Sequence, residues 1–190
     1  MKYLKPNELL KVLAGAKKRG LRELAMFCLA YHHGLRSSEI CKLLLTDIKD
    51  GTIDVRRLKG SEHTRDEITS DPNPLLDAKK ALAAWLRERQ DTGSVFLFTS
   101  RLGSGLKRRA IYDIFEDAAF HAGIEAGRRN IHIAKHTLGV TLRKAGVDLA
   151  TIAKALGHRD PATTIKFYQH VDRNEVKAAV TSAFAQLATA

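Results

Sequence analysis

The spacing of apolar residues constrains this chain most, because it is helical over nearly the whole length and changes period only once. Helical spacing predicts one helix opened by Pro6, a short one opened by Ser37 or Ser38, and helices over residues 21–33, 75–89, 107–122, 132–145, 149–156, 161–168 and 174–187. Residues 52–56 and 67–69 instead alternate, which predicts a β-hairpin with a polar turn between its strands. Residues 95–98 read as a short buried strand. The predicted fold is mainly α with a small antiparallel β-sheet.

Length and composition indicate one globular domain. The chain has 190 residues, of which 44% are hydrophobic and 28% charged, a balance that excludes disorder as the main state. No apolar run is long enough for a membrane span, and the N-terminus lacks the apolar region of a signal peptide. The two cysteines, Cys28 and Cys41, fit a reducing compartment, so we expect a cytoplasmic protein.

The net charge indicates a nucleic-acid partner. Lys and Arg number 32 against 21 Asp and Glu, a formal net charge of +11. Such a surface releases the counterions condensed on nucleic acid, which favours binding. The basic residues also cluster, as a surface that follows phosphates requires. The clusters are Arg56-Arg57-Leu58-Lys59, Lys107-Arg108-Arg109 and Arg128-Arg129. The alternative is a basic protein whose charge serves only solubility.

Several kinds of chemistry are excluded or disfavoured. The sequence has no P-loop and no dinucleotide-binding glycine motif, and its acidic residues do not cluster as a Mg²⁺ site requires. Cys28 and His32 lie four positions apart and Cys41 follows, but this spacing matches no standard zinc pattern. We therefore expect core cysteines, no metal and no cofactor.

The remaining candidates are cationic and imidazole groups followed by a late tyrosine. They are Arg36, Lys59, His132, Lys135, His158 and Tyr168. Phosphoryl transfer without a metal needs groups of this kind, because fixed donors must meet the charge on the phosphate oxygens, a hydroxyl must attack and an acid must protonate the leaving oxygen. Each residue also has a simpler interpretation: Arg36 pairs with Glu39, Lys59 is a solvated turn residue, His132 and His158 bind local backbone, and Tyr168 is a core aromatic.

Taken in order, these motifs resemble the tyrosine recombinase (phage integrase) family. The segment Gly34-Leu35-Arg36-Ser37-Ser38-Glu39-Ile40 is similar to the family's first-arginine motif, and Arg57-Leu58-Lys59-Gly60 to its β-hairpin lysine. The segment His132-Ile133-Ala134-Lys135-His136-Thr137 is similar to its His-x-x-Arg box. Leu156-Gly157-His158, with Thr164 and Tyr168, looks like its C-terminal box.

The resemblance implies a DNA strand-exchange reaction. Tyr168 would attack a phosphodiester and form a 3′-phosphotyrosyl link, releasing a 5′-hydroxyl that Lys59 protonates. Arg36 and Lys135 would hold the non-bridging oxygens, His132 would assist proton transfer and His158 would bind the phosphate. Arg57, Lys107, Arg108 and Arg109 are expected to contact the DNA.

The sequence departs from the family pattern in two places. Lys135 stands where the family has arginine, and lysine offers phosphate a point charge in place of a planar fork. A variant site and a weakened enzyme both fit this change. Ten positions separate His158 from Tyr168, one more than the family pattern, which predicts a bulge or an extra turn before Tyr168.

The resemblance also implies an organisation. Residues 1–172 would form the catalytic domain, and residues 173–190 a C-terminal helix that docks on a neighbouring subunit of a homo-tetramer on paired DNA sites, or else on its own domain. Because the catalytic part already opens at Pro6, we expect no N-terminal core-binding domain, as in short recombinases that invert fimbrial promoters; a trimmed catalytic domain fits equally. The alternative functions are a non-cleaving DNA-binding module and a topoisomerase-like relaxing activity.

Overall fold

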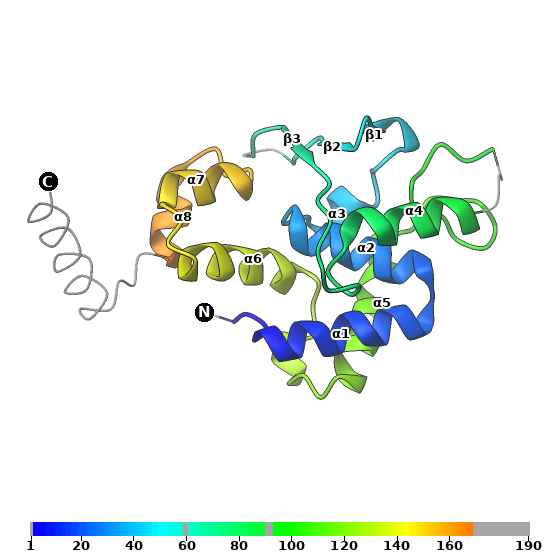
Figure 1. Ribbon diagram of the computed structural model, residues 1–190, viewed down its shortest axis with the longest axis horizontal. Coiled ribbons are helices and arrows are strands. Elements are labelled where there is room, and N and C mark those ends of the chain that lie inside the picture. The colour runs from blue at the N-terminus through cyan, green and yellow to red at the C-terminus, as the bar shows by residue number, and fades with distance from the viewer. Residues whose placement is uncertain (1, 59–60, 90–92, 169–190) are drawn as a thin grey trace, which may run out of the picture.

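A computed structural model describes residues 2–58, 61–89 and 93–168, and these form packed helices with a small sheet at one edge of the molecule (Figure 1). The first helices are α1 (Pro6–Arg19), α2 (Leu21–His32) and α3 (Ser37–Ile40). After the sheet come α4 (Ala78–Glu88), α5 (Arg108–His121), α6 (His132–Lys144), α7 (Leu149–Ala155) and α8 (Pro161–Tyr168). Short 3₁₀ turns lie at Leu45–Asp47 and Ala126–Arg128. This mainly helical architecture confirms the predicted fold class.

Helix α2 forms the centre of the core. Every residue from Glu23 to Ala30 is buried, and the helix packs against α1, α4 and α6. A helix that is buried around its whole circumference must be covered by neighbours on all sides, which is the arrangement seen here. The last residues of α2 lead directly into Gly34, whose φ of 56° lets the chain turn sharply towards α3.

The sheet carries the hairpin that the alternating pattern predicts, with a shifted second strand. Strands β1 (Ile48–Lys49), β2 (Thr52–Val55) and β3 (Thr64–Glu67) are antiparallel in the order β1-β2-β3 among the described residues. The second strand was expected at 67–69; it lies earlier because Val55 pairs with Thr64. The two-residue β1 was not predicted, since two residues are too few to show an alternating pattern.

Residues 95–98 do not form the predicted strand. Leu97 and Phe98 are buried, which explains the apolar run, but the backbone makes only isolated contacts. Its partners are the residues just before the sheet: Leu45 N–H donates to the Val95 carbonyl and Leu97 N–H to the Leu43 carbonyl, both at 2.9 Å. The segment therefore forms one isolated antiparallel bridge, Leu44 with Phe96, which is too short to count as a strand, and a short apolar run does not separate these two cases.

The helices after the sheet begin at side-chain caps where the sequence offers them. Helix α4 starts three residues later than predicted, because Asp77 accepts a hydrogen bond from Lys80 N–H at 2.8 Å and caps the helix there. Asp148 caps α7 in the same way. Helix α6 packs against α2, and α7 and α8 pack on each other beside α6, on the same side of the molecule as the hairpin (Figure 1).

Within the part of the chain that the structure describes, we find no helix with the length and apolar character needed to cross a bilayer.

The core assignment predicts a contrast between two leucines. Leu29→Ala, at a side chain with no exposed surface, should lower the free energy of unfolding by about 2–5 kcal/mol, because it opens a cavity in the core around α2. Leu86→Ala, at a side chain that is 38% exposed on α4, should cost about 1 kcal/mol or less. Urea unfolding followed by circular dichroism measures both; equal losses would contradict the placement of α2.

Candidate active site

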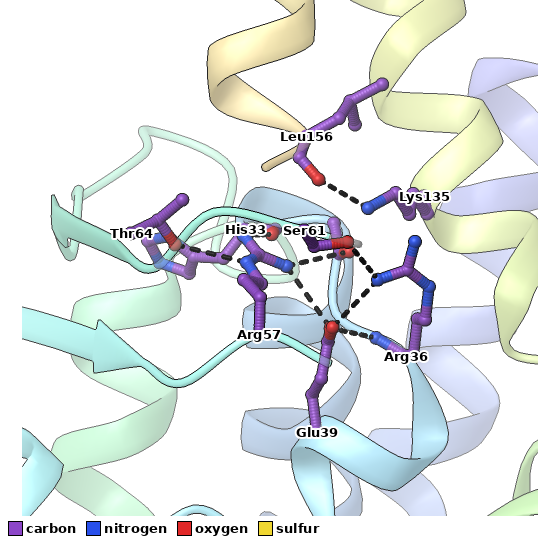
Figure 2. A network of polar contacts seen from close by, with 9 residues as sticks. His33, Arg36, Glu39, Arg57, Ser61, Thr64, Lys135 and Leu156 are labelled. Atoms are coloured by element: carbon purple, nitrogen blue, oxygen red, sulfur yellow. Dashed lines mark hydrogen bonds and ion pairs between the residues drawn. The ribbon is translucent and has the colours of Figure 1, made fainter. Parts of the chain in front are cut away.

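Arg36 is fixed by its own helix and by the hairpin. It lies at the N-cap of α3, where Glu39 accepts hydrogen bonds from the Arg36 backbone N–H at 2.8 Å and from its guanidinium at 2.9 Å. The same guanidinium nitrogen donates to Ser61 Oγ at 3.1 Å (Figure 2). The side chain stays 27% exposed. The simpler interpretation, a pair with Glu39, is therefore present, and it leaves part of the cation open to solvent.

Glu39 is the acceptor around which this network is built. Its side chain has no exposed surface and also accepts from Arg57 at 3.2 Å. Burial alone raises the pKa of Glu39, but the Arg36 N–H and the charges of Arg57 and Arg36 outweigh it, so the net pKa lies below the usual value. From the sequence, Glu39 was expected only as a partner for Arg36. An acidic residue three positions after a helix start is the signal that points to it.

Arg57 does not fit the expectation of a DNA contact. Its side chain is fully buried, and its guanidinium donates to the backbone carbonyls of His33 and Gly34, to Thr64 Oγ1 and to Glu39 (Figure 2). The protein thus supplies acceptors on every side, and no part of the group faces solvent. Its neighbour Arg56 is the outward-facing cation, with a side chain that is 73% exposed.

The turn after α7 brings the C-terminal box to the hairpin. Ser61 and His158 form an isolated β-bridge, and Glu62 N–H donates to the Gly157 carbonyl at 3.1 Å. His158 Nδ1 lies 2.8 Å from Thr164 Oγ1 of α8. Residues about a hundred positions apart are therefore adjacent here, and Ser61 touches both Arg36 and His158. Ser61 had no signal in the sequence, since its role depends only on this tertiary contact.

Lys135 lies beside the turn that carries His158, but its side chain points into the protein. Its residue surface is only 2% exposed, and its amine donates to the backbone carbonyl of Leu156 (Figure 2). Burial, followed by the charges of Arg36 and Arg57, lowers the pKa of Lys135 to about 7, although Glu39 opposes the shift. In this conformation the amine contacts backbone, and the expected contact with a phosphate oxygen is not available to it.

The two candidate histidines are neutral at neutral pH. His132, the first residue of α6, is exposed at the surface and meets the ring of His136 edge-on at 4.8 Å. Partial burial, then His136, Arg36 and Lys135, lower the pKa of His132 to about 4. Burial, and after it the charges of Lys135, Arg36 and Arg57, also lower the pKa of His158 to about 4. Each ring therefore keeps one nitrogen that can accept a proton.

The described charges around the site are unbalanced. Arg36, Arg57 and Lys135 lie around the buried carboxylate of Glu39, with Asp66 as a second described carboxylate whose charge acts on Arg57, and all three cations act on His158 electrostatically. An excess of fixed cations with neutral imidazoles beside them favours an anion over a metal ion. Among residues 2–58, 61–89 and 93–168, no group of three His, Cys, Asp or Glu side chains has metal-binding geometry.

The cluster Lys107-Arg108-Arg109 lies at the start of α5. All three residues are exposed, and the first turn of α5 has no acidic residue. Cations are unfavourable at a helix N-terminus, where the macrodipole is positive. Arg108 lies near Cys41, just after α3, since it opposes the burial that raises the pKa of the Cys41 thiol. The cluster therefore lies on the same part of the molecule as the residues after Arg36.

Of the remaining predicted residues, the structure describes only a part. Tyr168 is the last residue of α8, and its side chain lies outside the described part, as does Lys59. The predicted C-terminal segment 173–190 also lies outside the described residues. Helix α8 is unbroken from Pro161 to Tyr168, so the predicted bulge before Tyr168 does not occur within it.

Sequence comparisons identify the family. The profile of the phage integrase family matches residues 2–175. The type 1 fimbriae regulatory protein FimE of Escherichia coli K12 is 34% identical over 160 residues, which cover 78% of this chain and 74% of FimE. The tyrosine recombinase XerD of Caulobacter vibrioides is 35% identical over 183 residues, which cover 90% of this chain and 57% of XerD.

A solved structure has the same fold. The XerH site-specific recombinase, in a pre-cleavage complex bound to its difH substrate, superimposes with a TM-score of 0.74 at 25% identity. The match covers 95% of this chain and 54% of the XerH chain. The chain belongs to the phage integrase family of tyrosine recombinases, enzymes that cut and rejoin DNA. The family and the reaction class expected from the sequence motifs are thereby confirmed.

The buried position of Arg57 predicts a stability effect that its neighbour lacks. Arg57→Ala should lower the free energy of unfolding by about 3–5 kcal/mol, because it leaves Glu39 and two backbone carbonyls buried with fewer partners. Arg56→Ala removes the same charge from an exposed side chain and should change stability by about 0.5 kcal/mol or less. Denaturant unfolding of the two variants is the measurement; a stable Arg57→Ala protein that binds DNA weakly would reverse the assignment.

Proposed function

We propose that this chain breaks and rejoins DNA at specific sites through a covalent bond between Tyr168 and a 3′-phosphate. The phenolic oxygen attacks the phosphorus, the bond to the 5′ oxygen breaks, and that oxygen leaves as a hydroxyl after Lys59 donates a proton. The bond energy is kept in the phosphotyrosyl link, so a second 5′-hydroxyl can reverse the step with no external energy source.

The observation that carries this proposal is the arrangement of Arg36. Its guanidinium is held by Glu39 and Ser61 and remains 27% exposed, and Ser61 in turn forms the β-bridge with His158. A fixed and partly exposed cation stabilises charge that develops on a phosphate oxygen without having to reorganise. Arg36 is therefore our candidate for the group that holds the non-bridging oxygens.

The histidines are assigned complementary roles. His158 has its Nδ1 beside Thr164 Oγ1, which leaves Nε2 as the nitrogen that can donate to the phosphate when it carries the proton. His132 is exposed, and its pKa of about 4 keeps the ring neutral, so it can accept the proton that Tyr168 loses. Both roles use the neutral imidazole, which burial and, after it, the surrounding cations maintain.

Double-stranded DNA is the proposed substrate, and the exposed cluster Lys107-Arg108-Arg109 is the proposed phosphate contact outside the reacting centre. The related XerH recombinase is bound to its difH substrate in the solved complex. The first turn of α5 has no acidic residue, and although Arg109 is paired with Asp113 one turn later at 2.8 Å, Lys107 and Arg108 add positive charge that favours anions. We further propose that the enzyme acts in the cytoplasm as a tetramer on paired sites, with residues 173–190 joining the subunits.

The nucleophile assignment predicts a covalent adduct that depends on one hydroxyl. With a DNA duplex nicked next to the cleavage point, the native chain should form a protein–DNA adduct that survives denaturation, and Tyr168→Phe should form none. Tyr112→Phe removes a hydroxyl from a tyrosine that is 39% exposed on α5 and should keep the adduct. Denaturing gel electrophoresis and mass spectrometry of the adducted peptide report the result; an adduct formed by Tyr168→Phe would refute the assignment.

The cluster on α5 predicts a change in salt dependence. Replacing Lys107, Arg108 and Arg109 by alanine should weaken DNA binding and reduce the slope of log K against log[salt] by about 1 for each lost phosphate contact. A matched variant with alanine at Lys79, Lys80 and Arg87, exposed cations of α4, controls for net charge. Fluorescence anisotropy measures both slopes. The contact is contradicted if the two variants lose the same slope.

A further inference from the structure

The lysine at position 135 has a partner that a phosphate-binding group would not have. Its amine donates to the carbonyl of Leu156, the C-cap residue of α7. That carbonyl lies beyond the last turn of the helix, where backbone acceptors lack intrahelical donors. The residue surface of Lys135 is 2% exposed, whereas the Arg36 side chain is 27% exposed. The two cations of the site therefore face different environments.

The stem of Lys135 is enclosed as well as its amine. A Cβ placed on Gly34 would lie 3.5 Å from Lys135 Cγ and 3.1 Å from Leu156 Cδ2. The stem of Lys135 thus lies beside Gly34, just after α2, and its amine lies at Leu156, at the end of α7, so the side chain is packed at both places. The buried amine therefore donates to the Leu156 carbonyl and does not face solvent, where a substrate would bind.

The carbonyl that Lys135 holds begins the turn that carries His158. Gly157 follows with φ of 63°, and a Cβ there would lie 3.0 Å from Arg57 Nε and 3.2 Å from the Glu62 carbonyl. His158 comes next, tied to Ser61 by the β-bridge and to Thr164 by its ring. The turn is therefore held from the hairpin, from α8 and, through Lys135, from α6.

We propose that Lys135 is a positioning residue, which fixes the turn Leu156-Gly157-His158 through the Leu156 carbonyl and thereby orients the His158 ring, and that it does not neutralise the phosphate. The inference rests on the proposed function, since it takes His158 as the phosphate ligand. Holding one backbone carbonyl needs a single hydrogen-bond donor, which lysine has, and does not need the paired N–H donors of a guanidinium. The amine keeps a donor whether or not it is protonated, so the contact persists as it titrates.

The first test measures the turn without DNA. Lys135→Met keeps a chain of similar length and removes the donor. The amides of Gly157 and His158, which donate to Lys154 and Ala153, should then exchange with deuterium at least about 10-fold faster. Lys144→Met removes the same charge from an exposed position on α6 and should leave their exchange unchanged. Unchanged exchange in a folded Lys135→Met would overturn the inference, and this readout does not depend on whether the protein cleaves DNA.

The second test separates positioning from charge neutralisation. Lys135→Met should slow adduct formation on the nicked duplex by about 10²-fold, the scale expected for a misplaced catalytic group. With a methylphosphonate at the scissile position, which lacks the negative charge, the defect of Arg36→Ala should shrink while that of Lys135→Met persists. A Lys135→Met defect that disappears on the neutral substrate would make Lys135 a phosphate ligand and refute the proposal.

A double-mutant cycle completes the experiment. If Lys135 acts through His158, the variant carrying both Lys135→Met and His158→Ala should be no slower than His158→Ala alone. Rates that fall by the product of the two single effects would show independent roles and contradict the inference. If the native chain forms no adduct at all, the proposed function fails, while the exchange experiment still decides the role of Lys135.

Discussion

The site depends on the burial of one carboxylate between two arginines. Glu39 has no exposed surface, and its charge is balanced by Arg36 from its own helix and by Arg57 from the segment after β2. A buried charge is tolerated only when it is paired and hydrogen-bonded, so this contact fixes where the start of α3 lies against the hairpin. It also sets the direction of Arg36, because the same carboxylate holds the backbone and the guanidinium of that residue.

The contacts of Glu39 with the two arginines continue, through Arg36, to the C-terminal part of the described chain. Arg36 donates to Ser61, Ser61 bridges to His158, and Lys135 holds the start of the same turn through Leu156. Four separate stretches of sequence therefore meet within one network. Burial first, and then the charges of neighbouring cations, lower the pKa values of His132, His158 and Lys135, which leaves neutral imidazoles beside a fixed cation. Such a surface favours the doubly ester-linked phosphate that the family cleaves.

The sequence predicted the elements better where the pattern was long. Helices such as α1, α5 and α6 were correctly predicted, because apolar spacing persists over several turns, and α4 differed only at its start, where Asp77 supplies the cap. The strand at residues 95–98 was wrong, since the segment buries Leu97 and Phe98 but pairs only through an isolated bridge between Leu44 and Phe96. In the site, the motifs pointed to Arg36 and His158, which the structure brings together through Ser61. Glu39 was predicted only as a partner of Arg36 and Ser61 was not assigned a role, because the contact of Glu39 with Arg57 and the contacts of Ser61 join distant segments.

The sequence by itself determined the family, the mainly helical architecture and the types of chemical group available, because these follow from local periodicity and from motifs in a fixed order. Only the tertiary structure decided which cations face a substrate. Arg56 and Arg57 are adjacent and chemically identical, yet one is exposed and the other is buried. Lys135 occupies the position of a phosphate ligand and is bound to backbone. The physical reason is that burial is set by what packs against a residue from elsewhere in the chain, and no local pattern contains that information.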